Sequence, residues 1–367
     1  MVARQTSWRA PAPSRSRRLL RRTIMAAVLF LAAEAVLRLV ERAHGGRLPG
    51  EHFAASLKLP PGSQFAGRSV NRLGYWDDEF QVEPPPGVFR VAVLGDGLTL
   101  SGSYKTNCLS LLEPLVPGIE IYHFGLPRAG PREFAAQFVL DVAEFQPHLV
   151  LAFFSVGDDV TGQSHSHAAF DWHGVRLARL VTELLPERPS KNTVLDGASA
   201  AADYEDYLRQ CVQRLAVCRT PIDDELDRLW RQSLAQLGDL LRQCRRRELP
   251  LALVVVPVEY QVDRRLCETL RRRAGYEPGQ LDLELPQRRL AQFASAHDLP
   301  LIDLLPHLRA SEKSPYLRQA SNWNDEGHAL AGQALRGLLQ AHFGETIAVV
   351  PRPAAETVMR PRQSEAD

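Results

Sequence analysis

Apolar residues gather in five short runs, each of a length suited to one strand. The runs lie at 89–94, 119–124, 149–154, 251–256 and, more weakly, 301–305. The run at 149–154 is wholly apolar, which indicates a strand buried on both faces. Mixed polar and apolar patterns with helical spacing fall at 107–116, 131–145, 203–248, 285–297 and 326–342. The 203–248 stretch predicts two helices that break near Thr220-Pro221.

Strands that alternate with helices indicate right-handed βαβ units. The pattern therefore predicts a three-layer α/β/α, flavodoxin-like domain with a five-stranded parallel sheet. Ligand sites in such sheets lie outside the carboxyl ends of the strands. The sequence motifs described below all fall at or near such an end.

The N-terminal region has a different character from the body of the chain. Residues 1–22 contain seven Arg and no acidic residue, and 23–40 are mainly apolar. That length just suffices for a membrane helix, with the basic tail on the inner side. Two alternatives stay open: a signal peptide cleaved at Ala33-Glu34-Ala35, or an amphipathic surface helix. We expect a cell-membrane protein with a single pass and an extracytoplasmic main domain.

The predicted organisation has five parts. These are a basic cytoplasmic tail (1–22), a transmembrane signal anchor (23–42), a lead-in (43–88), one domain (89–345) and a disordered tail (346–367). Composition agrees with a folded body, since the 367 residues are 45% hydrophobic and 24% charged. A net charge of +1 gives no case for nucleic-acid binding. Cys211 and Cys218 share a helical face, so either one disulfide or two buried thiols is expected.

Five blocks of residues carry a resemblance to a known family. They are Asn71 to Tyr75 (NRLGY), Gly95 to Ser101 (GDGLTLS), His123 to Pro131 (HFGLPRAGP), Val156 to Val160 (VGDDV) and Tyr316 to Ala331, which contains Trp323-Asn324 and Gly327-His328. In order and spacing, the chain from about residue 70 to 342 resembles the SGNH/GDSL hydrolases, especially membrane-anchored bacterial members. The resemblance implies esterase or acyltransferase chemistry. That chemistry uses a serine nucleophile, a histidine base oriented by an aspartate, and an oxyanion hole.

Carried over position by position, each catalytic group is missing. The serine falls on Gly97, the oxyanion glycine on Arg128 and the oxyanion asparagine on Asp158. The aspartate and the histidine of the last block fall on Ala320 and Asn322. Gly97 has no atom to acylate, and an amide at Asn322 is not a base. An ionised Asp158 would repel an oxyanion. The sequence therefore predicts a pseudoenzyme without serine hydrolysis.

Two rearrangements would restore a reaction. Asp325 and His328 form a D-x-x-H spacing, although a packing role at a helix start is the plainer interpretation of His328. His165, His167, Asp171 and His173 cluster within nine residues and suit Zn²⁺ or a similar divalent metal, although a plain polar loop is the preferred interpretation. No other cofactor is expected.

The functional expectation rests on the resemblance. We expect a non-catalytic protein that binds a glycan or an envelope partner. The alternative is an active esterase or acyltransferase on acylated carbohydrate with a rearranged site. Trp172, Trp230 and Trp323 could stack on sugar rings, although a core position is commoner for tryptophan. The Arg271–Arg273 run fits a solvated helix face.

Overall fold

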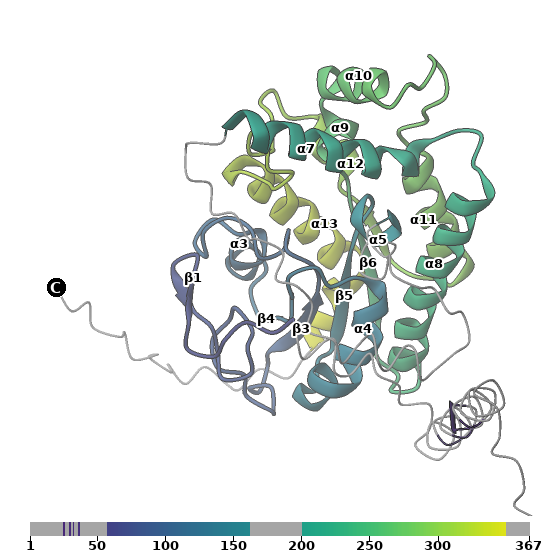
Figure 1. Ribbon diagram of the computed structural model, residues 1–367. Helices are drawn as coiled ribbons and strands as arrows, with labels where there is room; N and C mark the ends of the chain where they lie inside the picture. The colour runs from purple at the N-terminus through teal and green to yellow at the C-terminus, as the bar shows by residue number, and fades with distance from the viewer. Residues whose placement is uncertain are drawn as a thin grey trace, which may run out of the picture. The chain divides into compact units, whose positions relative to one another are not determined.

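The computed structural model describes residues 57–161 and 200–349, together with five helical positions between 25 and 36. The elements below belong to one compact unit. Its centre is a parallel sheet in the order β4-β3-β5-β6-β7 (Figure 1). The strands are β3 (Phe89–Leu94), β4 (Ile119–His123), β5 (Leu149–Ser155), β6 (Leu251–Val256) and β7 (Leu301–Asp303). This confirms the predicted α/β fold with a five-stranded parallel sheet.

Helices cover both faces of the sheet. The first half of the chain contributes α3 (Cys108–Leu115), α4 (Pro131–Gln137), a π-helix (Phe138–Val142), a 3₁₀ turn (Ala143–Phe145) and α5 (Asp158–Thr161). The second half contributes α7 (Ala200–Leu215), a 3₁₀ turn (Ala216–Cys218), α8 (Asp224–Arg245), α9 (Glu259–Val262), α10 (Arg264–Arg273), α11 (Leu285–Ala296), α12 (Leu305–Arg309) and α13 (Asp325–Val349). The predicted break in 203–248 lies between α7 and α8, where the Thr220-Pro221 peptide bond is cis.

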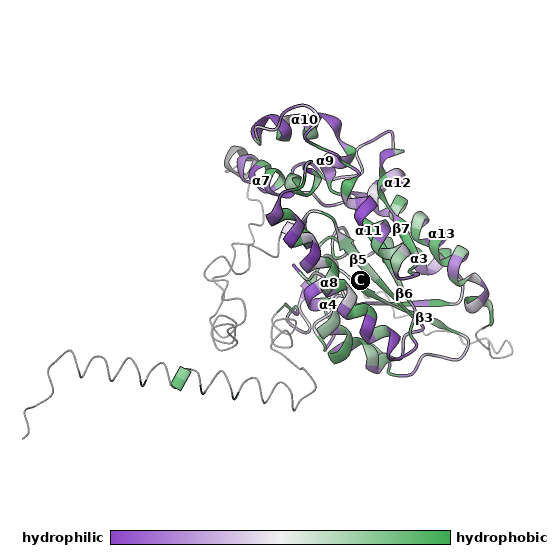
Figure 2. Ribbon diagram, turned by 90° about the vertical axis from the view of Figure 1, so that its right-hand side faces the viewer, coloured by the Kyte–Doolittle hydropathy of each residue, from purple (hydrophilic) through white to green (hydrophobic). Residues whose placement is uncertain are grey.

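The alternation of side chains along the strands creates two cores, one on each face of the sheet. Ala92, Val150 and Val255 point to the face covered by α4, α8 and α11. Val93, Leu151 and Val254 point to the opposite face, which is covered by α3, α12 and α13. Figure 2 shows the strands in green between helices with purple outer faces. The three layers follow from this double burial.

Residues 57–88, which the sequence analysis treats as a lead-in, pack against the domain. They include the short hairpin of β1 (Gln64–Phe65) and β2 (Arg68–Ser69). Phe80 stacks on Tyr122 of β4, with the ring centroids 4.4 Å apart. The fully buried Arg90 donates to the carbonyl oxygens of residues 81, 82 and 83 and pairs with Glu120 at 2.9 Å. This segment is therefore part of the folded unit.

Two elements end at residues other than those that the sequence predicts. β7 stops at Asp303 because the next residues start α12, with Pro306 in its first turn, where proline is favoured. α13 runs to Val349, beyond the predicted boundary at 345, because Phe343 and Ile347 are buried in the core. The rest of the predicted tail lies outside the described residues.

The predicted anchor at 23–42 also lies outside the described residues, apart from the five helical positions. Within the part of the chain that the structure describes, no helix is both long and apolar enough to cross a membrane. The anchor stays a prediction.

Candidate functional site

The first motif block forms the turn that follows β3. Leu98 N–H donates to the Asp96 carboxylate at 2.9 Å, and the turn continues through the buried Thr99. A Cβ atom placed on Gly97 would meet no other atom within 4 Å. The position of the family's nucleophile therefore has room for a side chain and offers none.

Asp96 ties this turn to the end of β5. Its Oδ2 accepts from the Ser155 hydroxyl at 2.7 Å. Burial, and after it the nearby charge of Asp158, raises the pKa of the Asp96 carboxyl to about 6. Asp159 is also buried and accepts from the Ser155 N–H at 2.8 Å, and burial followed by the charge of Asp96 raises its pKa. A cluster of carboxyl groups therefore lies below the turn.

Three side chains, which we call the cleft bridge, join segments that are far apart in the sequence. They are Asp158 at the start of α5, Arg214 in the last turn of α7, and Ser321 in the loop before α13. Arg214 Nε lies 2.6 Å from Asp158 Oδ1, and Arg214 Nη1 donates to Ser321 Oγ at 3.3 Å. The Arg214 side chain is 21% exposed and that of Asp158 is 48% exposed. The family's oxyanion asparagine is thus replaced by a carboxylate in an ion pair.

The cleft bridge brings several predicted positions together. Ser321 lies between Ala320 and Asn322, so the loop that would carry the aspartate and histidine lies beside Asp158. Asp158 in turn acts on Asp96, the neighbour of Gly97. None of these groups is a nucleophile paired with a base.

Arg128 adopts a backbone conformation that favours glycine, with φ at 62°. Its loop packs beside the first block, because Leu126 N–H donates to the Gly95 carbonyl at 3.0 Å. The left-handed conformation explains why the family motif has glycine here. An arginine in it costs about 1 kcal/mol of backbone strain.

His328 lies in the first turn of α13, faces the start of α3, and makes no hydrogen bond to the cleft bridge among the described residues. Its Nε2 is 3.2 Å from Ser101 Oγ, and its Nδ1 accepts from the Cys108 N–H at 3.3 Å. The ring is fully buried and packs edge-on against Trp323. Burial lowers its pKa to about 4, although the charge of Asp325 opposes this. Both ring nitrogens are occupied without Asp325, so the D-x-x-H spacing does not form the hydrogen-bonded pair that catalysis needs.

The predicted metal cluster of His165, His167, Asp171 and His173 lies outside the described residues. Within the described ranges, no three His, Cys, Asp or Glu residues are placed to hold a metal ion. Trp230 and Trp323 are fully buried, so they are core residues and not platforms for a sugar. Trp172 lies outside the described residues.

Sequence reasoning missed Arg214 and Ser155. Neither lies in a motif block, and Arg214 is 56 residues away from its partner Asp158. It also left the state of two cysteines open, and the structure has Cys211 and Cys218 as free buried thiols. The Arg271–Arg273 run forms ion pairs with Glu268 and Glu205, as expected of a solvated helix face.

The order of the motif blocks on parallel strands gives the chain an SGNH/GDSL hydrolase-like fold. No protein-family profile matches the sequence, and no curated protein matches it. Solved structures of similar fold include a lipolytic protein of the G-D-S-L family from Desulfitobacterium hafniense, at 13% identity over 68% of this chain and 99% of that one, with a TM-score of 0.40.

Two further structures are similar at the same level. An acetylxylan esterase from Geobacillus stearothermophilus, solved as a catalytic mutant, has 12% identity over 68% of this chain and 93% of its own, with a TM-score of 0.40. A psychrotrophic esterase from a Pseudoalteromonas species has 10% identity over 70% of this chain and 99% of its own, also with a TM-score of 0.40.

Proposed function

We propose that this chain is a non-catalytic SGNH/GDSL hydrolase-like protein, held at the membrane by residues 23–42, that binds a glycan or a protein of the envelope. One observation carries the loss of catalysis. Gly97 stands at the nucleophile position, and Asp158, whose charge acts on the neighbouring Asp96, is paired with Arg214. A serine hydrolase needs a hydroxyl, a base and donors for the oxyanion. In this chain the position of the hydroxyl is a glycine, Gly97, and the position of the oxyanion donor is a carboxylate, Asp158.

A fluorophosphonate probe tests this proposal on the purified full-length chain. We expect no labelling of the natural chain. We also expect none of a Gly97→Ser variant, because the new hydroxyl would have no base. Loss of the base alone costs about 10⁶-fold in serine-protease catalysis. Stoichiometric labelling of the natural chain would overturn the proposal, and rapid labelling of Gly97→Ser would show that a base exists.

One specific contact favours the alternative, an active esterase or acyltransferase. Ser101 Oγ and His328 Nε2 lie 3.2 Å apart, which resembles a nucleophile and its base. The hydrogen bonds around these two side chains run in the direction opposite to the one that catalysis needs. Nδ1 accepts from a backbone N–H, so the ring proton lies on Nε2 and is donated to Ser101, whose own hydroxyl donates to the Leu98 carbonyl at 2.6 Å. A histidine in this tautomer cannot take the serine proton.

A Ser101→Ala variant separates these two functions. If the natural chain hydrolyses acetyl esters and Ser101→Ala does not, the active alternative holds. We expect neither protein to exceed background hydrolysis. Thermal unfolding of the same samples gives a matched check that the variant is folded.

The anchoring and the envelope partner have their own experiments. A retained anchor keeps the full chain in the membrane pellet after carbonate extraction, whereas a mature N-terminus beyond residue 35 would indicate cleavage.

A photo-crosslinking amino acid at position 97 would face the open space beside the turn. A protein partner gives a crosslinked band from that position and none from the exposed position 239 on α8. The absence of any band favours a glycan.

A further inference from the structure

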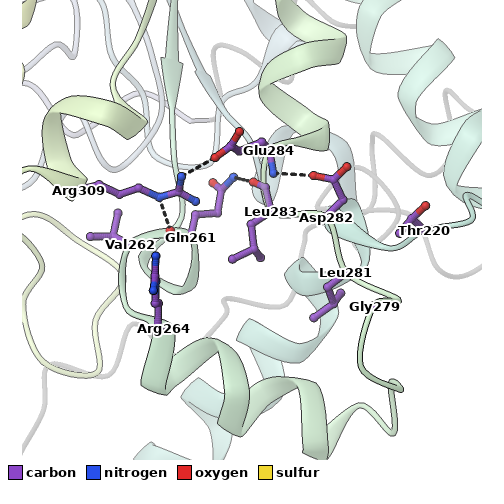
Figure 3. A pocket seen from close by; sticks show the side chains of 10 residues that line it. All are labelled: Thr220, Gln261, Val262, Arg264, Gly279, Leu281, Asp282, Leu283, Glu284 and Arg309. Carbon is purple, nitrogen blue, oxygen red and sulfur yellow. Dashed lines mark hydrogen bonds and ion pairs between the residues drawn. The ribbon is translucent and has the colours of Figure 1, made fainter.

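A cavity lies apart from the cleft bridge, at the carboxyl ends of β6 and β7. Its volume is about 810 Å³, within the range of small-molecule sites. The walls come from the end of α9, the start of α10, the 279–284 segment and the end of α12. In parallel sheets this edge is where ligands bind. Figure 3 shows charged, polar and apolar side chains together in the lining.

Two arginines and two carboxyl groups line this cavity, and Arg264 is the one of these four side chains without an ion pair in the described part of the chain. Glu284 pairs with Arg309 at 2.7 Å, and Asp282 pairs with Arg288 from α11. Arg264, at the first position of α10, is exposed and has no hydrogen bond or ion pair within the described residues. The Arg264 guanidinium is therefore available to pair with an anionic ligand.

Arg309 is held ready for such a ligand. Its Nε donates to the Gln261 carbonyl at 2.9 Å and its Nη1 donates to Glu284. These contacts use two of the five N–H donors of a guanidinium. Figure 3 shows the Arg309 head group between Gln261 and Glu284, with Arg264 on the same side in this view. A positioned guanidinium binds a carboxylate with less loss of side-chain entropy.

Part of the cavity lining is apolar. Val262, Leu281 and Leu283 line the cavity between the charged residues. We propose that this cavity binds an organic carboxylate, whose charge lies on Arg309 and Arg264 and whose apolar body packs against these three side chains. The site is independent of the cleft bridge and of any serine chemistry. Its failure would leave the proposed function unaffected.

Saturation-transfer NMR on the purified full-length chain tests this assignment, with benzoate as the probe. Benzamide has nearly the same shape and no charge. We expect benzoate to bind about tenfold or more tightly than benzamide, since a hydrogen bond to a charged group contributes more than a neutral one. Equal binding of the two probes, or no binding of benzoate, would overturn the proposal.

Two neighbouring arginines provide a matched pair of variants. Arg264→Gln should weaken benzoate binding about fivefold or more. Arg265→Gln removes the same charge from an exposed neighbour outside the cavity lining, and should change binding less than about twofold. Equal losses in the two variants would mean that only the general charge of α10 attracts the probe, and would refute the site.

A third variant tests the opposite direction. Glu284→Gln removes the carboxylate that partly neutralises Arg309, so benzoate should bind about two- to fivefold more tightly. A tighter complex cannot result from loss of folding. Unchanged or weaker binding in folded Glu284→Gln protein would exclude Arg309 as the anion ligand.

Discussion

Asp96→Asn is the substitution that most directly tests the electrostatics of the cleft. Asp96 is buried below the turn that carries Gly97, and it accepts from the Leu98 N–H and the Ser155 hydroxyl. Asparagine can accept from Leu98 with its oxygen and donate to Ser155 with its amide. The variant therefore keeps the contacts of the turn and removes the charge.

The expected magnitude follows from the pKa of Asp96. Burial raises this pKa from 3.8 to about 6 in the folded state. A group with a raised folded pKa contributes stability that is fully present below about pH 4 and is lost as the pH rises through 6. A difference of about two units corresponds to at most about 3 kcal/mol. The free energy of unfolding of Asp96→Asn, relative to the natural chain, should therefore be up to about 3 kcal/mol higher at pH 8 than at pH 4.

Urea denaturation at pH values from 4 to 8 measures this difference. Asp239→Asn is the control, because Asp239 is an exposed residue of α8 in an i,i+3 pair with Arg242. The control should change stability by less than about 0.5 kcal/mol at each pH. If the relative stability of Asp96→Asn does not rise with pH, then Asp96 is not a buried carboxyl under electrostatic stress, and our account of the cleft is wrong.

Three further predictions concern other buried polar groups. In urea denaturation, Arg90→Met should lower the free energy of unfolding by about 3–5 kcal/mol, because removal of the fully buried guanidinium leaves its carbonyl partners unpaired. Glu120→Gln, at a partly exposed position, should lower it by about 1 kcal/mol. A double-mutant cycle of Arg214→Met and Asp158→Asn should give a coupling energy of about 1 kcal/mol, and a value near zero would contradict the cleft bridge. His328→Ala should cost about 2–4 kcal/mol at pH 8. That cost should shrink from pH 6.5 toward 4, because the folded state of the natural chain resists protonation of this ring; a cost independent of pH would refute the burial argument.

The fold was largely readable from the sequence because its signals are local. Each central strand is a short apolar run, and the helices between the strands keep their own periodicity. The predictions failed where tertiary packing decides. The lead-in carries few periodic residues, yet Tyr75, Trp76 and Phe80 are buried. Only the exposed face of α10 was readable, from the Arg271–Arg273 run, because its arginines mask the helical spacing of the two leucines that face the core.

The candidate site was only half readable, for a related reason. Motif blocks are local, so the missing serine at Gly97 is visible in the sequence alone. The partner of Asp158 is not local, since Arg214 lies on a helix that no block marks. Likewise, nothing in the sequence separates a catalytic His328 from a buried one. That distinction depends on the backbone N–H of Cys108, which fixes the position of the ring proton.

The positions at which this chain differs from the family's catalytic residues are better understood together than one by one. A carboxylate at position 158 would by itself add a second charge beside the buried Asp96, whose pKa it already raises. Arg214 offsets that charge and also contacts Ser321 in the loop before α13. Ser321 has a left-handed backbone, with φ at 51°, which residues other than glycine adopt only rarely. The aspartate at 158, the arginine on α7 and the loop before α13 thus stabilise one another. Restoring a serine at position 97 alone would therefore leave an intact ion pair where the oxyanion would have to form.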